Sequence, residues 1–229
     1  MSDSGTHTGQ VSTIAGGGAG SRGFQDGPAA KAKFAWPYGV ATSPDGHTVY
    51  VGDSGNNRVR SIDVLSGTVS TLAGTGIAGY QDGAASAARF YGPRGVVASP
   101  DGSLVFVADY SNFRVRTLEL AGGEHGEATV STLFGGKGEI YRPAGVAVTS
   151  NGEWVLAADS ANAKIRGVQV SSLNLEAPSS FSGSLASAVA DSGVSVAPAA
   201  AAVASTQNSS PPVQFPSGRE NNRVIHGET

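Results

Sequence analysis

Short apolar runs separated by turn-forming dipeptides recur along residues 10–170. The run over residues 48–53 is rich in Val and ends at Asp53, and residues 58–64 then alternate, beginning Arg58, Val59, Arg60. Alternation with a period of two is typical of a β-strand with one solvated face, whereas a mostly apolar run suits a strand covered on both faces. Asp-Gly and Asn-Gly dipeptides between the runs supply the positive φ that tight hairpins require. The pattern predicts short antiparallel strands and an all-β fold.

The same runs recur three times in the same order, which marks an internal repeat. A phrase of Val-Ser-Thr, two apolar residues and Gly occupies residues 11–16, 69–74 and 130–135. A Pro-x-Gly-Val motif begins at Pro37, Pro93 and Pro143, and the next apolar run ends at Asp53, Asp109 and Asp159. These aspartates are 56 and 50 residues apart, enough for four short strands and their turns.

Each repeat is predicted to form one four-stranded antiparallel unit. In the first copy, the strands are expected at residues 39–42, 48–53, 58–64 and 68–73. Such a small sheet cannot cover its own faces and must stack on its neighbours, as the blades of a β-propeller do. A continuous β-sandwich would explain the strands but not the repetition.

Two motifs, Pro-x-Gly-Val and Asp-x-x-Asn-x-Arg-Val, resemble those of the NHL-repeat family of β-propellers over about residues 10–170. The Asn that gives this family part of its name corresponds to Asn56, Asn112 and Asn162. The positions where the family often has His are occupied by Asn57, Phe113 and Ala163. The resemblance implies three propeller blades. It also implies candidate functions, because some tripartite-motif relatives bind RNA through a basic face and some six-bladed relatives are metal-dependent hydrolases or lyases.

Three domains or segments are expected: a flexible N-terminus (1–9), the propeller blades (10–176) and an Ala/Ser/Pro-rich disordered tail (177–229). Three blades form an incomplete ring, since propellers usually have about four to eight. The blades begin with a lone fourth-strand phrase at Val11 and end after a third strand at Val170. The chain is therefore interpreted as a fragment or as half of a homodimer that exchanges these strands to complete a six-bladed ring.

The connections before the first two blades, from Phe24 to Phe34 and from Tyr80 to Phe90, contain an insertion that the third connection lacks. Each insertion is expected to hold one helical turn. Asp26 and Asp82 are the expected N-caps of these turns.

Composition narrows the possible functions. The net charge of −3 gives no overall attraction to nucleic acid, and the absence of Cys excludes disulfides and thiolate chemistry. No secretory signal or membrane-spanning segment is recognised, so a cytoplasmic, intracellular location is expected. The four His residues, at 7, 47, 125 and 226, lack metal-ligand spacing and predict no metal site.

The repeated aspartates Asp53, Asp109 and Asp159 are interpreted as scaffold residues that accept hydrogen bonds from the following turn and pair with an arginine of the third strand. The arginines of the third strands are candidates for a basic stripe, with salt bridging between blades as the alternative. Tyr38 and Arg94, with Ala144 in the third copy, enter the first strands near the expected propeller axis. The candidate binding residues are Tyr38, Arg94, Arg58, Arg60, Arg114 and Arg116.

No catalytic cluster and no cofactor site is predicted. The sequence favours a non-catalytic interaction module that presents loops and strand edges to a protein, a peptide or, with less support, RNA. The alternative is a metal-dependent lactonase-like, esterase-like or lyase propeller enzyme. An Arg near the axis disfavours a divalent cation there.

Overall fold

The computed structural model describes residues 11–17, 20, 22–120, 127–136 and 138–170. The chain divides into two units, residues 1–176 and 177–229, and the second lies wholly outside the described residues. The described part consists of β-strands and three one-turn 3₁₀ segments, with no α-helix. The predicted all-β fold is confirmed, whereas the expected disordered tail falls outside the described part.

Three antiparallel sheets follow one another along the chain. The first has the order β1-β5-β4-β3-β2 and comprises β1 (Gly27–Pro28), β2 (Pro37–Thr42), β3 (Thr48–Asp53), β4 (Arg58–Asp63) and β5 (Thr68–Ala73). The second has the order β6-β10-β9-β8-β7 and comprises β6 (Gly83–Ala84), β7 (Pro93–Ala98), β8 (Leu104–Asp109), β9 (Arg114–Glu119) and β10 (Thr129–Gly135). The third comprises β11 (Pro143–Val148), β12 (Trp154–Asp159) and β13 (Lys164–Gln169).

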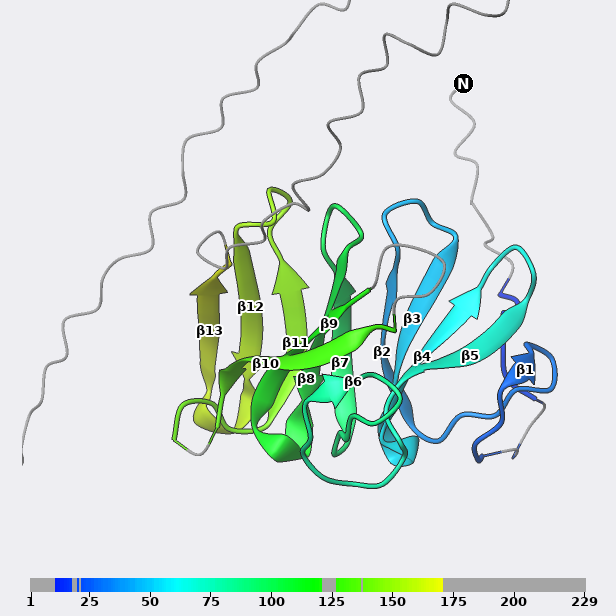
Figure 1. Ribbon diagram of the computed structural model, residues 1–229, viewed down its shortest axis with the longest axis horizontal. Coiled ribbons are helices and arrows are strands. Elements are labelled where there is room, and N and C mark those ends of the chain that lie inside the picture. The colour runs from blue at the N-terminus through cyan, green and yellow to red at the C-terminus, as the bar shows by residue number, and fades with distance from the viewer. Residues whose placement is uncertain (1–10, 18–19, 21, 121–126, 137, 171–229) are drawn as a thin grey trace, which may run out of the picture. The chain divides into compact units, whose positions relative to one another are not determined.

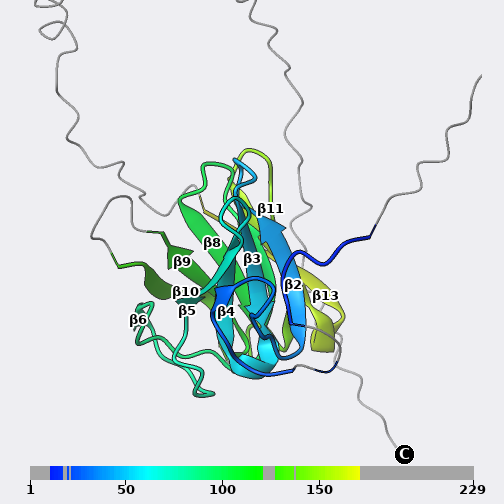
Figure 2. The ribbon, with the colours of Figure 1, turned by 90° about the vertical axis from the view of Figure 1, so that its right-hand side faces the viewer.

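The sheets are arranged as propeller blades. Figure 1 shows them side by side in chain order, and Figure 2 shows them one behind another. The first long strands, β2, β7 and β11, are neighbours from blade to blade. One core cluster joins Tyr50 and Val59 of the first blade to Phe90 and Val96 of the second, and an equivalent cluster joins the second blade to the third. Apolar packing between blades therefore covers the faces that a single blade would expose.

Glycines of the Pro-x-Gly-Val motif allow the first strands to approach closely. A Cβ added at Gly39 would lie 2.8 Å from the Gly95 Cα, and one added at Gly95 would lie 2.8 Å from the Gly145 Cα. Such distances leave no room for a methyl group. The motif therefore sets the spacing of adjacent blades at their inner edges.

The insertions before the first two blades differ from expectation. Each insertion forms a two-residue strand, β1 or β6, which was not expected, followed by the expected single helical turn, in which the N–H of Ala32 donates to the Pro28 carbonyl and that of Ala88 to the Ala84 carbonyl, both at 2.9 Å. Pairing of β1 with β5 and of β6 with β10 adds a fifth strand to each blade. Asp26 and Asp82 are not N-caps; their carboxylates bind the arginines of the third strands instead.

The N-terminal copy of the fourth-strand phrase, residues 11–16, forms no strand in the structure. A β-strand requires a neighbouring strand to satisfy its backbone groups, and among the described residues no strand pairs with this segment. The other two copies form β5 and β10, each paired with the third strand of its own blade.

We predict that Gly95→Ala destabilises the protein. The added methyl overlaps the backbone of the third blade, and overpacking of this kind costs about 1–3 kcal/mol. Urea unfolding should show this loss in the free energy of unfolding. Gly23→Ala is the control, because its Cβ would meet only the Lys33 side chain, at 3.5 Å. Equal stability of the two variants would contradict the close-approach argument.

Candidate interaction surface

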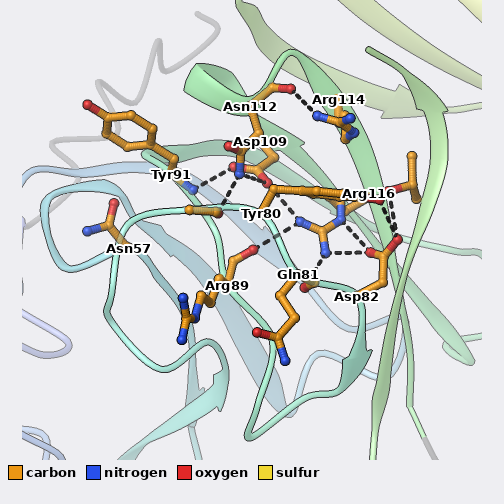
Figure 3. Close-up of polar contacts among 12 residues, drawn as sticks. Asn57, Tyr80, Gln81, Asp82, Arg89, Tyr91, Asp109, Asn112, Arg114 and Arg116 are labelled. Carbon is orange, nitrogen blue, oxygen red and sulfur yellow. Dashed lines mark hydrogen bonds and ion pairs between the residues drawn. The ribbon is translucent and has the colours of Figure 1, made fainter.

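The repeated Asp at the end of each second strand is a buried hydrogen-bond acceptor. In the second blade, Asp109 is fully buried and accepts the Tyr91 N–H at 2.8 Å, the Asn112 side-chain amide at 2.8 Å and the Arg116 guanidinium at 2.9 Å (Figure 3). Asn112 also donates to the Gly79 carbonyl, at 2.7 Å. The Asn of the repeat motif thus ties the second strand to the inserted connection.

Arg116 completes this network from β9. Its side chain is fully buried and donates to Asp109, to Asp82 (3.0 Å) and to the carbonyls of Arg89 (3.1 Å) and Gln81 (2.8 Å). Figure 3 shows the guanidinium enclosed by these groups. A buried guanidinium is tolerated only when its N–H groups are bonded and its charge is balanced. The insertion supplies both the second carboxylate and the two carbonyls.

The first blade repeats the arrangement. Arg60, also fully buried, bonds Asp53 at 2.8 Å, Asp26 at 3.0 Å and the carbonyls of Lys33 (3.1 Å) and Gln25 (2.9 Å). Arg60 and Arg116, two of the residues expected to bind partners, therefore lie in the interior of their blades. Each arginine forms its salt bridges with aspartates of its own blade and of the insertion before that blade. These salt bridges do not join one blade to the next.

The third blade keeps the aspartate but lacks the insertion. Asp159 accepts the Tyr141 N–H at 2.8 Å and Arg166 Nε at 3.2 Å. Without a second carboxylate or an enclosing segment, the Arg166 side chain remains 39% exposed. The shorter connection therefore leaves the arginine of the third blade more accessible than its counterparts.

The second and third blades also differ in the pKa of this repeated aspartate. Burial in the middle blade raises the pKa of Asp109 to about 6, against the hydrogen bonds from Asn112, the Tyr91 N–H and Arg116. Burial also acts on Asp159, but hydrogen bonds from Asn162, the Tyr141 N–H and Arg166 outweigh it and lower the pKa of Asp159. The same repeat position therefore titrates differently in the two blades.

Arg58 and Arg114 occupy equivalent, half-buried positions at the start of the third strands. The Arg58 guanidinium lies 3.8 Å from the Phe24 ring centre and donates to the Thr75 carbonyl at 2.7 Å. Arg114 lies 3.9 Å from the Tyr80 ring centre and donates to the Asn112 carbonyl at 2.8 Å. Both side chains brace the insertions, although they are more accessible than Arg60 and Arg116.

Tyr38 and Arg94 come together in a continuous array. The Arg94 guanidinium lies 4.5 Å from the Tyr38 ring centre and 3.3 Å from that of Tyr110. Arg142 lies 5.8 Å from Tyr110 and 5.7 Å from Tyr141. Tyr141 in turn stacks on Phe113, with ring centres 4.5 Å apart. We name this array the arginine–aromatic ladder; its members are Tyr38, Arg94, Tyr110, Arg142, Tyr141 and Phe113.

The ladder runs across all three blades at the end of the sheets where first strands begin and second strands end. Tyr38 is 61% exposed and Tyr141 is 43% exposed. Within the described part of the chain, neither Arg94 nor Arg142 forms a salt bridge with a carboxylate. The ladder therefore presents two arginines and several aromatic faces to solvent.

The residue before the Pro of each Pro-x-Gly-Val motif has a positive φ. Trp36, Gly92 and Arg142 occupy the same repeat position, immediately before the Pro, and all three have positive φ, at 46°, 64° and 56°. Gly adopts such a φ freely, but large side chains do so at a cost, and such strain is commonly found at functional sites. Trp36 is nonetheless 64% exposed, with Arg22 4.2 Å from its ring centre. Two blades thus hold a large exposed side chain where Gly would be less strained.

Tyr38 and Arg94 were expected from the sequence, whereas Tyr110, Arg142, Tyr141 and Phe113 were not. These four occupy different repeat positions, so no alignment of the copies groups them. In the described residues no group of three His, Asp or Glu side chains is placed to hold a metal ion. Nor does any helix there have the length and apolarity to cross a membrane.

We predict that Arg116→Met strongly destabilises the protein. Removing one partner of a buried ion pair costs about 3–5 kcal/mol because the remaining charge is left unpaired. Here, Asp109 loses its cation, and Asp82 and two carbonyls lose a donor. Arg166→Met is the matched control and should cost less, since Arg166 is partly exposed. Chemical denaturation of both variants provides the comparison, and a larger loss for Arg166→Met would contradict this account.

The carboxyl pKa values predict opposite pH dependences. Asp109 binds its proton more tightly when folded, so its contribution to the free energy of unfolding falls as pH rises from the ordinary pKa of 3.8 to about 6. The Asp159 contribution is present above the ordinary pKa and is lost as pH falls through its lower folded pKa. Carbon-detected NMR titration of the carboxyl groups, with Asp109→Asn and Asp159→Asn for assignment, tests both. An Asp109 that titrates below Asp159 would refute the prediction.

No family model matches the chain. Curated relatives include the SUPPRESSOR OF QUENCHING 1 protein, chloroplastic, of Arabidopsis thaliana, 37% identical over 113 residues that make up 49% of this chain and 10% of that protein. NHL repeat-containing protein 2 is 32% identical in Bos taurus and 30% identical in Homo sapiens, in each case over 42% of this chain and 13% of the relative. The chain thus matches only about a tenth of the length of these relatives.

Solved structures show partial likeness. A nidogen–laminin complex has a TM-score of 0.46 at 16% identity, over 60% of this chain and 46% of that chain. An auxiliary nutrient binding protein from Bacteroides thetaiotaomicron has a TM-score of 0.48 at 18% identity, over 60% and 37%. The assignment rests on the sequence relatives and on the blades themselves. The repeated motifs and the blades that they form resemble those of NHL-repeat β-propellers, and the chain is similar to the NHL repeat-containing relatives over 42% of its length.

Proposed function

We propose that the chain is a non-catalytic interaction module whose arginine–aromatic ladder binds an acidic segment of a protein partner. The carrying observation is the ladder itself, in which Arg94 and Arg142 lie beside aromatic rings and have no carboxylate partner in the described residues. Guanidinium groups form strong, bidentate hydrogen bonds with carboxylates. Aromatic rings hold each guanidinium in place, which lowers the entropy lost on binding.

The other charged groups of the blades support this assignment. Arg60 and Arg116 are fully buried and bonded to scaffold carboxylates, so they are not available to a partner. The ladder differs because its guanidinium groups contact rings and leave their donors accessible. An acidic peptide that also carries aromatic residues would complement both features.

We predict that Arg94→Ala weakens binding of a fluorescein-labelled peptide of glutamate and tyrosine residues about tenfold, the equivalent of one charge-assisted contact. Fluorescence anisotropy at two salt concentrations measures the affinity, which should fall as salt rises. Arg89→Ala removes the same charge from an exposed insertion residue outside the ladder and should leave affinity unchanged.

An oligouridine of equal charge is the comparison ligand. Tighter binding of oligouridine than of the peptide would reject the protein-partner proposal in favour of nucleic acid, since base stacking on aromatic rings is the usual basis of single-strand binding. Equal peptide affinities of Arg94→Ala and the unaltered protein would reject the ladder as the site.

A further inference from the structure

The second blade has a small open site where the first blade holds an aromatic ring. The position before the Pro of the Pro-x-Gly-Val motif is Trp36 in the first blade and Arg142 in the third, but Gly92 in the second. The Trp36 ring lies on Gly55, since a Cβ added at Gly55 would be 2.6 Å from the Trp36 Cε3 atom. The second blade has Ser111 in place of Gly55, and Gly92 has no side chain to cover it.

Two serine hydroxyls line this site. A Cβ added at Gly92 would lie 3.5 Å from the Oγ atoms of both Ser54 and Ser111. Ser54 belongs to the 3₁₀ turn of the first blade (Ser54–Asn56), and Ser111 belongs to that of the second (Tyr110–Asn112). Both residues are half-buried, and neither hydroxyl has a hydrogen-bond partner among the described residues. We name the site formed by Ser54, Gly92 and Ser111 the Gly92 notch.

The guanidinium of Arg94 lies at the junction of the same two blades. It is 4.5 Å from the ring centre of Tyr38 in the first blade and 3.3 Å from that of Tyr110 in the second. Tyr110 immediately precedes Ser111 in the 3₁₀ turn. The notch therefore offers two hydroxyl donors at the end of the sheets where the ladder holds a cation that has no carboxylate partner in the described part of the chain.

The junction between the second and third blades differs at each of these positions. Tyr110 stands there in place of Ser54, and Ala161 stands in place of Ser111. The side chain of Arg142 extends from the position of Gly92 to within 5.8 Å of the Tyr110 ring centre. This second junction thus has rings and a cation but lacks the pair of hydroxyls.

We infer that the Gly92 notch binds a phosphate monoester carried by the acidic segment, with Ser54, Ser111 and Arg94 as donors. A phosphorylated side chain carries about −1.5 to −2 charge at pH 7 and three strong acceptor oxygens. A carboxylate has only two oxygens, and one guanidinium can bond both of them. Two additional hydroxyls therefore favour the tetrahedral, doubly charged group. This inference rests on the proposed peptide binding by the ladder.

Two peptides of equal net charge test the inference. The first is the fluorescein-labelled peptide of glutamate and tyrosine residues, and in the second one Glu is replaced by phosphoserine and another by Gln. Fluorescence anisotropy should show about tenfold tighter binding of the phosphopeptide, because it gains charge-assisted hydrogen bonds. Equal affinities would overturn the phosphate site and leave the ladder as a site for carboxylates, whereas binding of neither peptide would overturn both proposals.

Substitutions in the notch locate the phosphate. The double variant Ser54→Ala/Ser111→Ala should bind both peptides with the affinity that the unaltered protein has for the glutamate peptide. Ala is compatible with the turn, since Ala161 occupies the position of Ser111 in the third blade. Ser66→Ala removes a hydroxyl from the exposed turn between β4 and β5 and should leave the tenfold preference unchanged. A preference that persists in the double variant would overturn the inference.

Filling the notch provides a second variant. Gly92→Asn places an amide between the two hydroxyls, and Asn tolerates the positive φ of 64° at this position. The folded variant, checked by circular dichroism, should lose the preference for phosphate but still bind the glutamate peptide. A Gly92→Asn protein that keeps the tenfold preference would contradict binding in the notch.

Two competitors distinguish the source of the phosphate. Inorganic phosphate should displace the phosphopeptide only at concentrations far above that of the peptide, because it makes no contact with the aromatic rings of the ladder. Displacement at equal concentration would overturn the assignment to a phosphate on a peptide. Tighter binding of a 5′-phosphorylated oligouridine than of the phosphopeptide would overturn it in favour of nucleic acid.

Discussion

The buried pairing of an aspartate with an arginine from the neighbouring strand is the interaction on which the first two blades depend. It joins three parts of each repeat, because Asp109 ends the second strand, Arg116 lies on the third and Asp82 belongs to the inserted connection. Desolvation makes such a pair unfavourable unless every donor is bonded. The inserted segment meets this condition by supplying a second carboxylate and two backbone carbonyls, so its path over the blade follows from the chemistry of the guanidinium.

The third blade lacks the insertion, and this changes only the surroundings of its aspartate and arginine. The third blade keeps the Asp159 acceptor network but leaves Arg166 partly exposed, and its carboxyl pKa is lowered, not raised. Packing between blades is a separate constraint, set by apolar side chains and by glycines such as Gly95 that permit backbone contact. Strand pairing and the buried ion pairs thus determine the structure within each blade. Apolar packing and the close approach of backbones at glycine determine how each blade contacts the next.

The arginines fall into a buried group and an accessible group, and their positions in the repeat determine which group they belong to. Arg60 and Arg116, at the third position of the third strands, are buried and are used in the scaffold. Those at the entry to the first strands, Arg94 and Arg142, lie beside aromatic rings at the end of the sheets and remain accessible. A bulge in the pairing of β7 with β8 between Pro93 and Val96 places Arg94 outside the regular ladder of hydrogen bonds.

The sequence by itself determined the repeats, the long strands of each blade and the pairing of Asp53 with Arg60, because strand period, turn dipeptides and repeated residues are local or periodic signals. It misassigned Asp26 and Asp82 as N-caps of the turns in the insertions, since a carboxylate at such a position suits an N-cap until a buried guanidinium competes for it. Only the tertiary structure decided that Arg60 and Arg116 are buried while Tyr38 and Arg94 join a surface array. That array links different repeat positions on different blades, and only the packing of blades brings them together.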